Sequence, residues 1–265
     1  MMSLQKELRR MVSSLSYNTY EARLEKEVMA SPAPKHVAVI MDGNRRYAKE
    51  VLNSEAATDG HKKGQEKLGE VMEWCRKLDI KILTVFAFST ENFDRDCEEV
   101  EFLMDLLEST LFKFADDERT HKNRIALRVI GERTLIPDRV LRAIECAEER
   151  TAEYSDFHLN VAIAYGGRQE ITQAVREIAA KVKDGTMDID DIDEESISKN
   201  LYTFDLPDPE LILRTSGELR ISNFLLWQLA YSEFYFSDVF WPGFRYVDFL
   251  RAVRAFQQRS RRYGQ

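Results

Sequence analysis

A carboxylate, a glycine, an amide and two guanidinium groups directly follow a short apolar run near the start of the chain. Residues 37–46 read Val-Ala-Val-Ile-Met-Asp-Gly-Asn-Arg-Arg. The apolar run is typical of a buried parallel strand, and open α/β sheets bind ligands just beyond the carboxyl ends of such strands. If a helix follows at once, Asn44, Arg45 and Arg46 lie in its first turn, where free backbone N–H groups favour an anion. Asp42 beside an anion suggests a metal ion between them. The alternative that these ten residues leave open is a helix capped by Asp42, with solvated arginines.

Polar side chains also follow two later apolar runs, residues 81–89 and residues 210–213. Because the carboxyl ends of parallel strands meet at one edge of a sheet, we expect the groups after all three runs to share a site. Surface salt bridges are the structural alternative, but arginines on either side of a flexible Gly turn are typical of a loop that folds around a multiply charged oxyanion. The side chains are Ser89, Asn92 and Arg95 after the first run, and Arg214, Arg220 and Ser222 after the second.

The arginines and carboxylates together indicate a metal-assisted reaction of a diphosphate. The arginines named above are sufficient for two anionic groups, and Asp42 and Glu233 are the candidate ligands of a divalent cation. Glu233 is an acid within the aromatic run 232–236. Mg²⁺ prefers oxygen ligands, so a carboxylate with flanking arginines suits a clamp on a diphosphate leaving group.

Other chemistries are disfavoured by the motifs. No GxGxxG fingerprint opens the first strand-to-helix turn, and no GxxxxGK[ST] phosphate loop occurs. Ser89 lies in no nucleophile elbow, and each cysteine falls within a helical pattern. The acidic run 188–195 lacks the turn glycine of a calcium loop, so we interpret it as a solvated loop that caps the next helix.

An alternation of strand and helix patterns must position these groups. It predicts a single α/β domain with a mostly parallel central sheet of about six strands flanked by helices. The apolar stripe of the predicted helix 97–116 packs in the core by default; the alternative is that it lines a hydrophobic substrate channel. Strands are predicted at 37–41, 81–89, 125–130, 159–164, 210–213 and 232–236, and helices at 64–78, 97–116, 137–153, 169–183, 224–231 and from 247.

The first residues are expected to form an N-terminal helical segment, 1–30, ahead of the catalytic domain, 31–265. Apolar residues recur at roughly helical spacing over 4–28, with basic residues between them. Such a helix could lie on a membrane, but packing on its own domain or on a partner is the favoured interpretation.

The composition excludes several classes of protein. A net charge of −8 argues against a nucleic-acid-binding protein, for which a basic face is expected. Three cysteines without a CxxC pair indicate neither a disulfide framework nor a zinc site, so a cytoplasmic, reduced location fits best. No apolar run approaches the ~20 residues needed to span a bilayer, so any membrane contact is expected to be peripheral.

Longer motifs around these groups follow one another from about residue 36 to the C-terminus. They read Met-Asp-Gly-Asn-Arg-Arg-Tyr-Ala-Lys at 41–49, Gly-His at 60–61, Phe-Ala-Phe-Ser-Thr-Glu-Asn-Phe at 86–93, Arg-Thr-Ser-Gly-Glu at 214–218 and Trp-Pro at 241–242. Together they resemble the cis-prenyltransferase family, the undecaprenyl and dehydrodolichyl diphosphate synthases. The variant Arg45-Arg46-Tyr47 is similar to the eukaryotic and archaeal branch.

The resemblance implies Mg²⁺-dependent elongation of an allylic prenyl diphosphate, farnesyl or geranylgeranyl diphosphate, with isopentenyl diphosphate to a long-chain polyprenyl diphosphate. It also implies a hydrophobic tunnel between sheet and helices, and Glu99 near the allylic substrate. The implied roles are catalysis for Asp42, His61, Ser89 and Asn92; allylic diphosphate binding for Gly43, Asn44, Arg45, Arg46 and Arg95; isopentenyl diphosphate binding for Arg214, Arg220, Ser222, Arg262 and Gly264; and metal binding for Asp42 and Glu233.

Two further features concern partners. The ending Arg262-Tyr263-Gly264 resembles the family's C-terminal Arg-X-Gly, which reaches the partner subunit's site, and its presence together with Asp42 favours a homodimer. Ala57 stands where members commonly have a diphosphate-binding arginine, for which Lys62 or Lys63 is a candidate substitute. The alternative function is therefore a non-catalytic partner or a polyprenyl-lipid-binding subunit on the same fold.

Product length is expected to depend on which bulky residues close the far end of the channel. The candidates are Leu103, Leu107, Leu111 and Phe112.

Overall fold

Six parallel strands form one sheet in the order β3-β4-β2-β1-β5-β6. The computed structural model describes residues 19–259. β1 lies between β2, which follows it in the chain, and β5, which returns from the far edge of the sheet; ligands bind at the carboxyl ends of strands at such a switch point. The strands are β1 His36–Ile40, β2 Ile82–Ser89, β3 Ile125–Ile130, β4 Phe157–Tyr165, β5 Leu211–Arg214 and β6 Glu233–Phe236.

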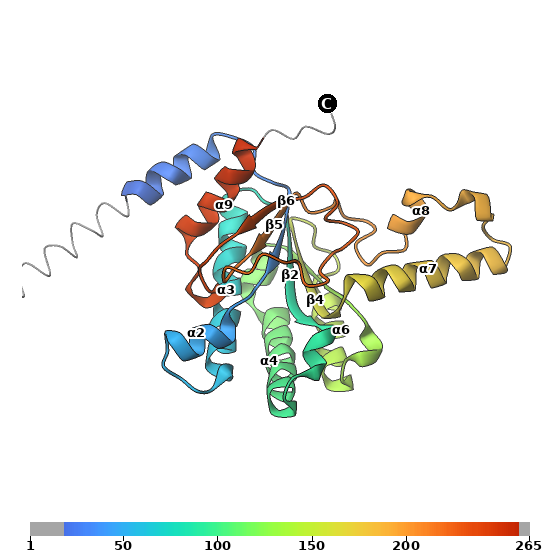
Figure 1. Ribbon diagram of the computed structural model, residues 1–265, viewed down its shortest axis with the longest axis horizontal. Coiled ribbons are helices and arrows are strands. Elements are labelled where there is room, and N and C mark those ends of the chain that lie inside the picture. Colours follow the sequence, from blue (N-terminus) through green and yellow to red (C-terminus); the bar gives the residue numbers. More distant parts are fainter. Residues whose placement is uncertain (1–18, 260–265) are drawn as a thin grey trace, which may run out of the picture.

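Helices connect the strands, and most of them cover one face of the sheet. α3, α4, α6 and α9 share a continuous core with that face, whereas α7 and α8 extend away from it (Figure 1). The helices are α2 Asn44–Glu50, α3 Ala57–Lys77, α4 Cys97–Asp116, α5 Glu118–Lys122, α6 Asp138–Thr151, α7 Gly167–Lys183, α8 Glu194–Ser198 and α9 Tyr246–Gln258. The predicted parallel α/β domain is confirmed.

Alternation along the strands divides the core between the two faces. Val37 and Val39 pack with the helices, while Ala38 and Ile40 belong to a smaller cluster on the opposite face. Successive side chains of a strand point to opposite faces, so a near-continuous apolar run is what a sheet buried on both faces requires.

Residues 19–29 are helical and pack on the domain beside α9 (Figure 1). Leu24 and Val28 are each 1% exposed and belong to the main core. The amide of Gln257 donates to the backbone carbonyl of Val28 at 2.9 Å. The expected packing on the domain therefore holds for this stretch, while residues 4–18 of the predicted helix lie outside the described residues.

The structure corrects one element, the helix predicted at 224–231, which is a series of turns. Ser222 and Leu225 have φ angles of 49° and 44°, in the left-handed region that a right-handed helix excludes. Phe224 is fully buried and stacks on Phe86 with ring centroids 4.6 Å apart. The apolar residues of this segment are thus buried against the sheet and do not form one face of a helix.

Two further expectations concern the surface. Asp193 caps α8 by accepting a hydrogen bond from the backbone N–H of Ser196 at 2.7 Å, as the capping interpretation of the acidic run predicted. Within residues 19–259, no helix is both long enough and apolar enough to span a membrane.

Candidate active site

Asp42 occupies the turn between β1 and α2. Gly43 makes this turn with a φ of 99°, and a Cβ atom there would lie 2.8 Å from the ring of Phe240 and 2.9 Å from Cβ of Ser216. Glycine is therefore required here for two reasons: the backbone is left-handed, and there is no room for a side chain. The N–H of Gly43 donates to Oδ1 of Asp42 at 2.6 Å, and the hydroxyl of Thr215 donates to the Asp42 carbonyl at 2.7 Å.

Arg214, the last residue of β5, is the buried partner of Asp42. Its side chain is 3% exposed, and its Nη2 donates to Oδ2 of Asp42 at 2.7 Å. Its Nη1 donates to the hydroxyl of Ser222 at 3.0 Å and to the carbonyl of Arg220. Partial burial acts to raise the pKa of Asp42, but the hydrogen bond and charge of Arg214 outweigh it and hold this pKa below its ordinary value. Asp42 is therefore ionised at neutral pH.

Arg46 links the first turn to the loop after β5. Its Nη2 donates to the hydroxyl of Ser216 at 2.7 Å and lies 3.4 Å from Oδ1 of Asp42. Its Nη1 lies 3.2 Å from a carboxylate oxygen of Glu218. The Arg46 side chain is 39% exposed, so it can meet a ligand at the surface of the site.

Close helix packing positions Asn44 at the start of α2. A Cβ atom on Gly60 would lie 2.0 Å from the Asn44 carbonyl oxygen, and one on Gly64 would lie 2.2 Å from Oδ1 of Asn44. Gly60 thus lets α3 touch the backbone of α2, and Gly64 leaves room for the Asn44 side chain. Oδ1 of Asn44 is buried and has no hydrogen-bond partner among the described residues.

Glu99 of α4 is a carboxylate shared by three basic side chains. It is 11% exposed, and its Oε1 lies 3.0 Å from Nη1 of Arg95 and 3.3 Å from Nε2 of His61. Its Oε2 lies 3.7 Å from Nε of Arg45. Burial lowers the pKa of His61 and outweighs the opposing effect of Glu99, so His61 is neutral at neutral pH. Glu99 thereby joins three predicted site residues from separate segments.

The loop after β2 is held by its own side chains and by the loop after β5. Oδ1 of Asn92 accepts from the backbone N–H of Ser89 at 3.2 Å. The amide of Asn223 donates to Glu91 at 3.0 Å. Partial burial acts to raise the pKa of Glu91, but hydrogen bonds with its own backbone N–H, with Asn223 and with Ser89 outweigh it and lower this pKa. The two loops are therefore fastened to each other beside the site.

A polar pocket at this edge of the sheet gathers most of the predicted residues. It lies at the carboxyl ends of β1 and β5, where Asp42 contacts Arg214. A smaller neighbouring hollow adds Gly43, Arg45 and Arg46. The pocket is lined by Asp42, Asn44, His61, Ser89, Asn92, Arg95, Arg214, Arg220 and Ser222.

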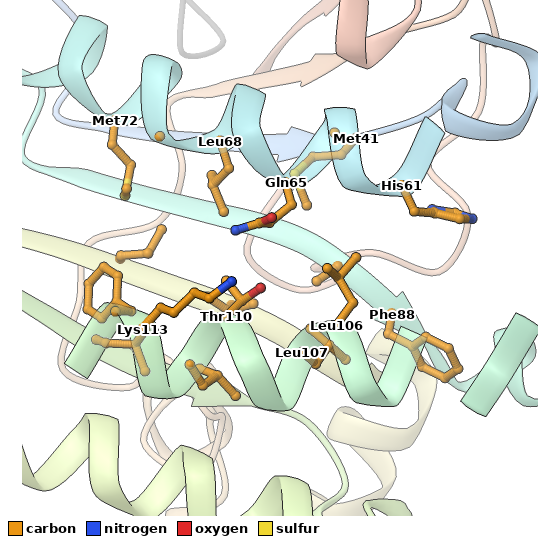
Figure 2. A pocket seen from close by; sticks show the side chains of 18 of the residues that line it. Met41, His61, Gln65, Leu68, Met72, Phe88, Leu106, Leu107, Thr110 and Lys113 are labelled. Carbon is orange, nitrogen blue, oxygen red and sulfur yellow. The ribbon is translucent and has the colours of Figure 1, made fainter. Parts of the chain in front are cut away.

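An apolar tunnel of about 320 Å³ continues from the polar pocket between α3 and α4 (Figure 2). Met41, His61 and Phe88 line both spaces, so the two are contiguous. The predicted hydrophobic tunnel is therefore present. From the stripe of α4, Leu103, Leu107, Leu111 and Phe114 line the tunnel, whereas Met104 packs in the core and Phe112 is exposed.

Glu233 does not lie with Asp42. It is the first residue of β6 and pairs in register with Leu211, whereas Asp42 meets Arg214 at the other end of β5. Three strand residues, about 10 Å, separate these levels. Glu233 accepts instead from Arg259, at 2.5 Å. Within one chain, the structure therefore does not bring these two predicted metal ligands together. Arg262 and Gly264 lie outside the described residues.

Ala57 is the first residue of α3, and both candidate substitutes, Lys62 and Lys63, contact other side chains. Nζ of Lys62 lies 5.7 Å from the ring centroid of Phe102, and Lys63 pairs with Glu66 at 2.7 Å. Neither lysine is among the described residues that line the polar pocket.

The donor set at Asp42 fits Mg²⁺ that is shared between the protein and a phosphate ligand. Proteins hold such ions through one or two carboxylates together with phosphate oxygens and water. Asp42 supplies an ionised carboxylate in the pocket wall. In the stretch 19–259, no three His, Cys, Asp or Glu side chains gather into a metal site of their own. Asp42 would therefore hold the ion together with phosphate oxygens of the ligand.

A family model described as putative undecaprenyl diphosphate synthase matches residues 40–264. The chain belongs to the cis-prenyltransferase family. Among relatives of this cis-prenyltransferase, the tritrans,polycis-undecaprenyl-diphosphate synthases (geranylgeranyl-diphosphate specific) of Methanopyrus kandleri and Methanocaldococcus jannaschii are 55% and 54% identical. The aligned regions cover 94% and 92% of this chain, and 91% and 88% of the relatives.

Solved structures agree with this assignment. Lavandulyl diphosphate synthase from Lavandula x intermedia, in complex with dimethylallyl diphosphate, is 37% identical with a TM-score of 0.81. A probable undecaprenyl diphosphate synthase from Campylobacter jejuni is 35% identical with a TM-score of 0.71. Each alignment covers 88% of this chain and 99% of the other. The protein is thus an enzyme, a transferase of prenyl groups.

Some residues of the cis-prenyltransferase site had no role in the sequence interpretation. Ser216 and Glu218 both bind Arg46. They lie within the motif at 214–218, but the motif alone assigned them no role. The spacing of Gly60 and Gly64 by one helical turn was a usable signal, because small residues at that spacing let helices approach closely.

Proposed function

We propose that this cis-prenyltransferase elongates geranylgeranyl diphosphate with isopentenyl diphosphate to a long-chain polyprenyl diphosphate. The observation that carries the proposal is the continuity of an arginine-lined pocket with an apolar tunnel, which suits a diphosphate head and a hydrocarbon tail. The names of the two archaeal relatives support geranylgeranyl diphosphate as the primer.

Two groups of side chains would bind the two diphosphates. Arg45, Arg46 and Arg95 surround the hollow at the turn after β1 and would hold the allylic diphosphate. Arg214, Arg220 and Ser222, on and after β5, would hold isopentenyl diphosphate. The Asp42 carboxylate lies between the two groups, in contact with Arg46 and Arg214.

The reaction follows from this arrangement. The C4 carbon of isopentenyl diphosphate attacks C1 of the allylic substrate, the C1–O bond breaks, and a C2 proton leaves to form the new cis double bond. Negative charge grows on the departing diphosphate, where preorganised arginine donors lower the barrier. When bound at Asp42, Mg²⁺ supplies further charge neutralisation of that diphosphate. We assign the proton transfer to the polar wall formed by His61, Ser89 and Asn92.

We further propose a homodimer. Glu233 lies away from Asp42 in its own chain, and a second copy would supply it together with Arg262 and Gly264 of the C-terminal tail. Each site would then contain residues of both copies.

The purified protein is incubated with geranylgeranyl diphosphate, labelled isopentenyl diphosphate and Mg²⁺, and products are resolved by chain length. We expect elongated polyprenyl products, and none when EDTA is added before the substrates. Farnesyl diphosphate in a parallel reaction tests the primer. Lack of any elongated product with either primer would refute the proposal and favour the non-catalytic alternative; products that persist in EDTA would refute the metal requirement alone.

A further inference from the structure

α3 contains three glycines, and the structure explains only two of them by close approach. Gly60 and Gly64 leave room for Asn44. At Gly69, no heavy atom of the described chain lies within 4 Å of an added Cβ atom, and the backbone has no positive φ. Glycine is the least favourable residue inside a helix after proline, because it has the most backbone freedom to lose. Gly69 is therefore required neither for packing nor for backbone conformation.

Gly69 faces the tunnel. Gln65, Leu68, Gly69 and Met72 all line it, at the spacing i, i+3, i+4, i+7 that places them on one face of α3. Figure 2 shows the labelled side chains of this face directed toward Leu106, Thr110 and Lys113 of α4 across the cavity. Gly69 thus belongs to the tunnel wall, and the space beside its added Cβ atom is open.

The tunnel is small for a long hydrocarbon. At about 320 Å³ it lies at the lower end of the range for ligand pockets, roughly 300–1,000 Å³. A chain that gains one isoprene unit in each cycle needs more space as it grows. Gly64 also lines the tunnel, but Asn44 and Trp241 fill the space beside it, so Gly69 is where α3 offers more room.

We propose that Gly69 is a specificity-determining residue for product length. The missing side chain leaves the middle of the tunnel wall open, and the growing prenyl chain passes through this opening between α3 and α4. The inference rests on the proposed chain elongation and concerns the far part of the same site.

The test compares product lengths of the wild-type protein, Gly69→Leu and Gly69→Ala in the elongation assay. We expect the Leu side chain to shift the main product by at least one isoprene unit toward shorter chains, with a smaller shift for Ala. The matched control is Glu66→Leu, which adds the same side chain to an exposed position of α3 outside the tunnel lining.

Thermal unfolding supplies a second readout that does not depend on activity. Because Ala is favoured over Gly inside a helix and meets no neighbour here, Gly69→Ala should raise Tm by about 2 to 4 °C. A lower Tm would show that Gly69 serves packing and would overturn the inference. It is also overturned if wild-type protein elongates and both Gly69 variants give the wild-type length distribution. If the wild-type protein forms no product, the proposed function itself fails.

Discussion

Nη2 of Arg214 donates a 2.7 Å hydrogen bond to Oδ2 of Asp42, between residues 172 positions apart in the chain. The contact joins the carboxyl ends of β1 and β5, and through it the two arginine groups of the site. Arg214 is almost fully buried, so its charge depends on this carboxylate for compensation. The pair therefore has a structural role in addition to the proposed metal role of Asp42.

Replacement of that carboxylate should separate the two roles. We expect Asp42→Ala to lower turnover by at least about 100-fold, as loss of a key electrostatic group does. It should also lower the free energy of unfolding by about 1–3 kcal/mol, because Arg214 loses a partner while the open pocket still admits water. Elongation rates and urea unfolding measure the two effects. The control Asp190→Ala removes an exposed carboxylate from the acidic run and should change neither; full activity of Asp42→Ala contradicts the metal role.

Gly64→Ala should disturb the site through packing. The added methyl group would lie 2.2 Å from Oδ1 of Asn44 and 3.0 Å from the ring of Trp241, so α2 must shift. We expect a loss of about 1–3 kcal/mol in the free energy of unfolding and a rise in KM for the allylic substrate. The matched control is Gly69→Ala on the same helix, which should stabilise the protein. Equal stability changes in the two variants would show that the close approach at Asn44 has no energetic role.

His36 should make stability depend on pH. Burial lowers its pKa to about 4, since the ring lies in the sheet with Nδ1 at 2.7 Å from the Pro207 carbonyl and Nε2 at 2.7 Å from the Thr84 hydroxyl. The unfolded chain takes up a proton near pH 6.5 and the folded chain only near 4, so stability is full above pH 6.5 and falls as the pH drops toward 4. The loss is about 3 kcal/mol. Urea unfolding at a series of pH values should show a flatter profile for His36→Gln; an unchanged slope would refute this assignment.

Subunit mixing tests whether two copies share a site. Asp42→Ala and Glu233→Ala should each be nearly inactive alone. In a mixed dimer one site loses both carboxylates and the other keeps both, so co-refolded variants should recover about a quarter of the wild-type rate. Light scattering checks that dimers are present. If dimers form but mixing equal concentrations restores no activity, a site that combines Asp42 with the Glu233 of a second copy is contradicted. High activity of Glu233→Ala alone would exclude a metal role for Glu233.

Much of the fold was predictable because its signals are local. The helix predicted at 97–116 has the same bounds in α4, since its apolar stripe and its Asp96 cap lie within one stretch of chain. The strand at 125–130 likewise matches β3. The segment 224–231 was not predictable from its own pattern, because burial of Phe224 against Phe86 overrides the helical spacing.

The sequence by itself determined the order of the elements, the family and the polar residues that gather at the carboxyl ends of β1, β2 and β5, because hydrophobic period and motif spacing are properties of neighbouring residues. The tertiary structure decided which of those residues meet. The register of β5 and β6 separates Glu233 from Asp42, and the close approach of α2 to α3 explains the glycines at positions 60 and 64. Such contacts join residues far apart in the chain, so no local pattern contains them.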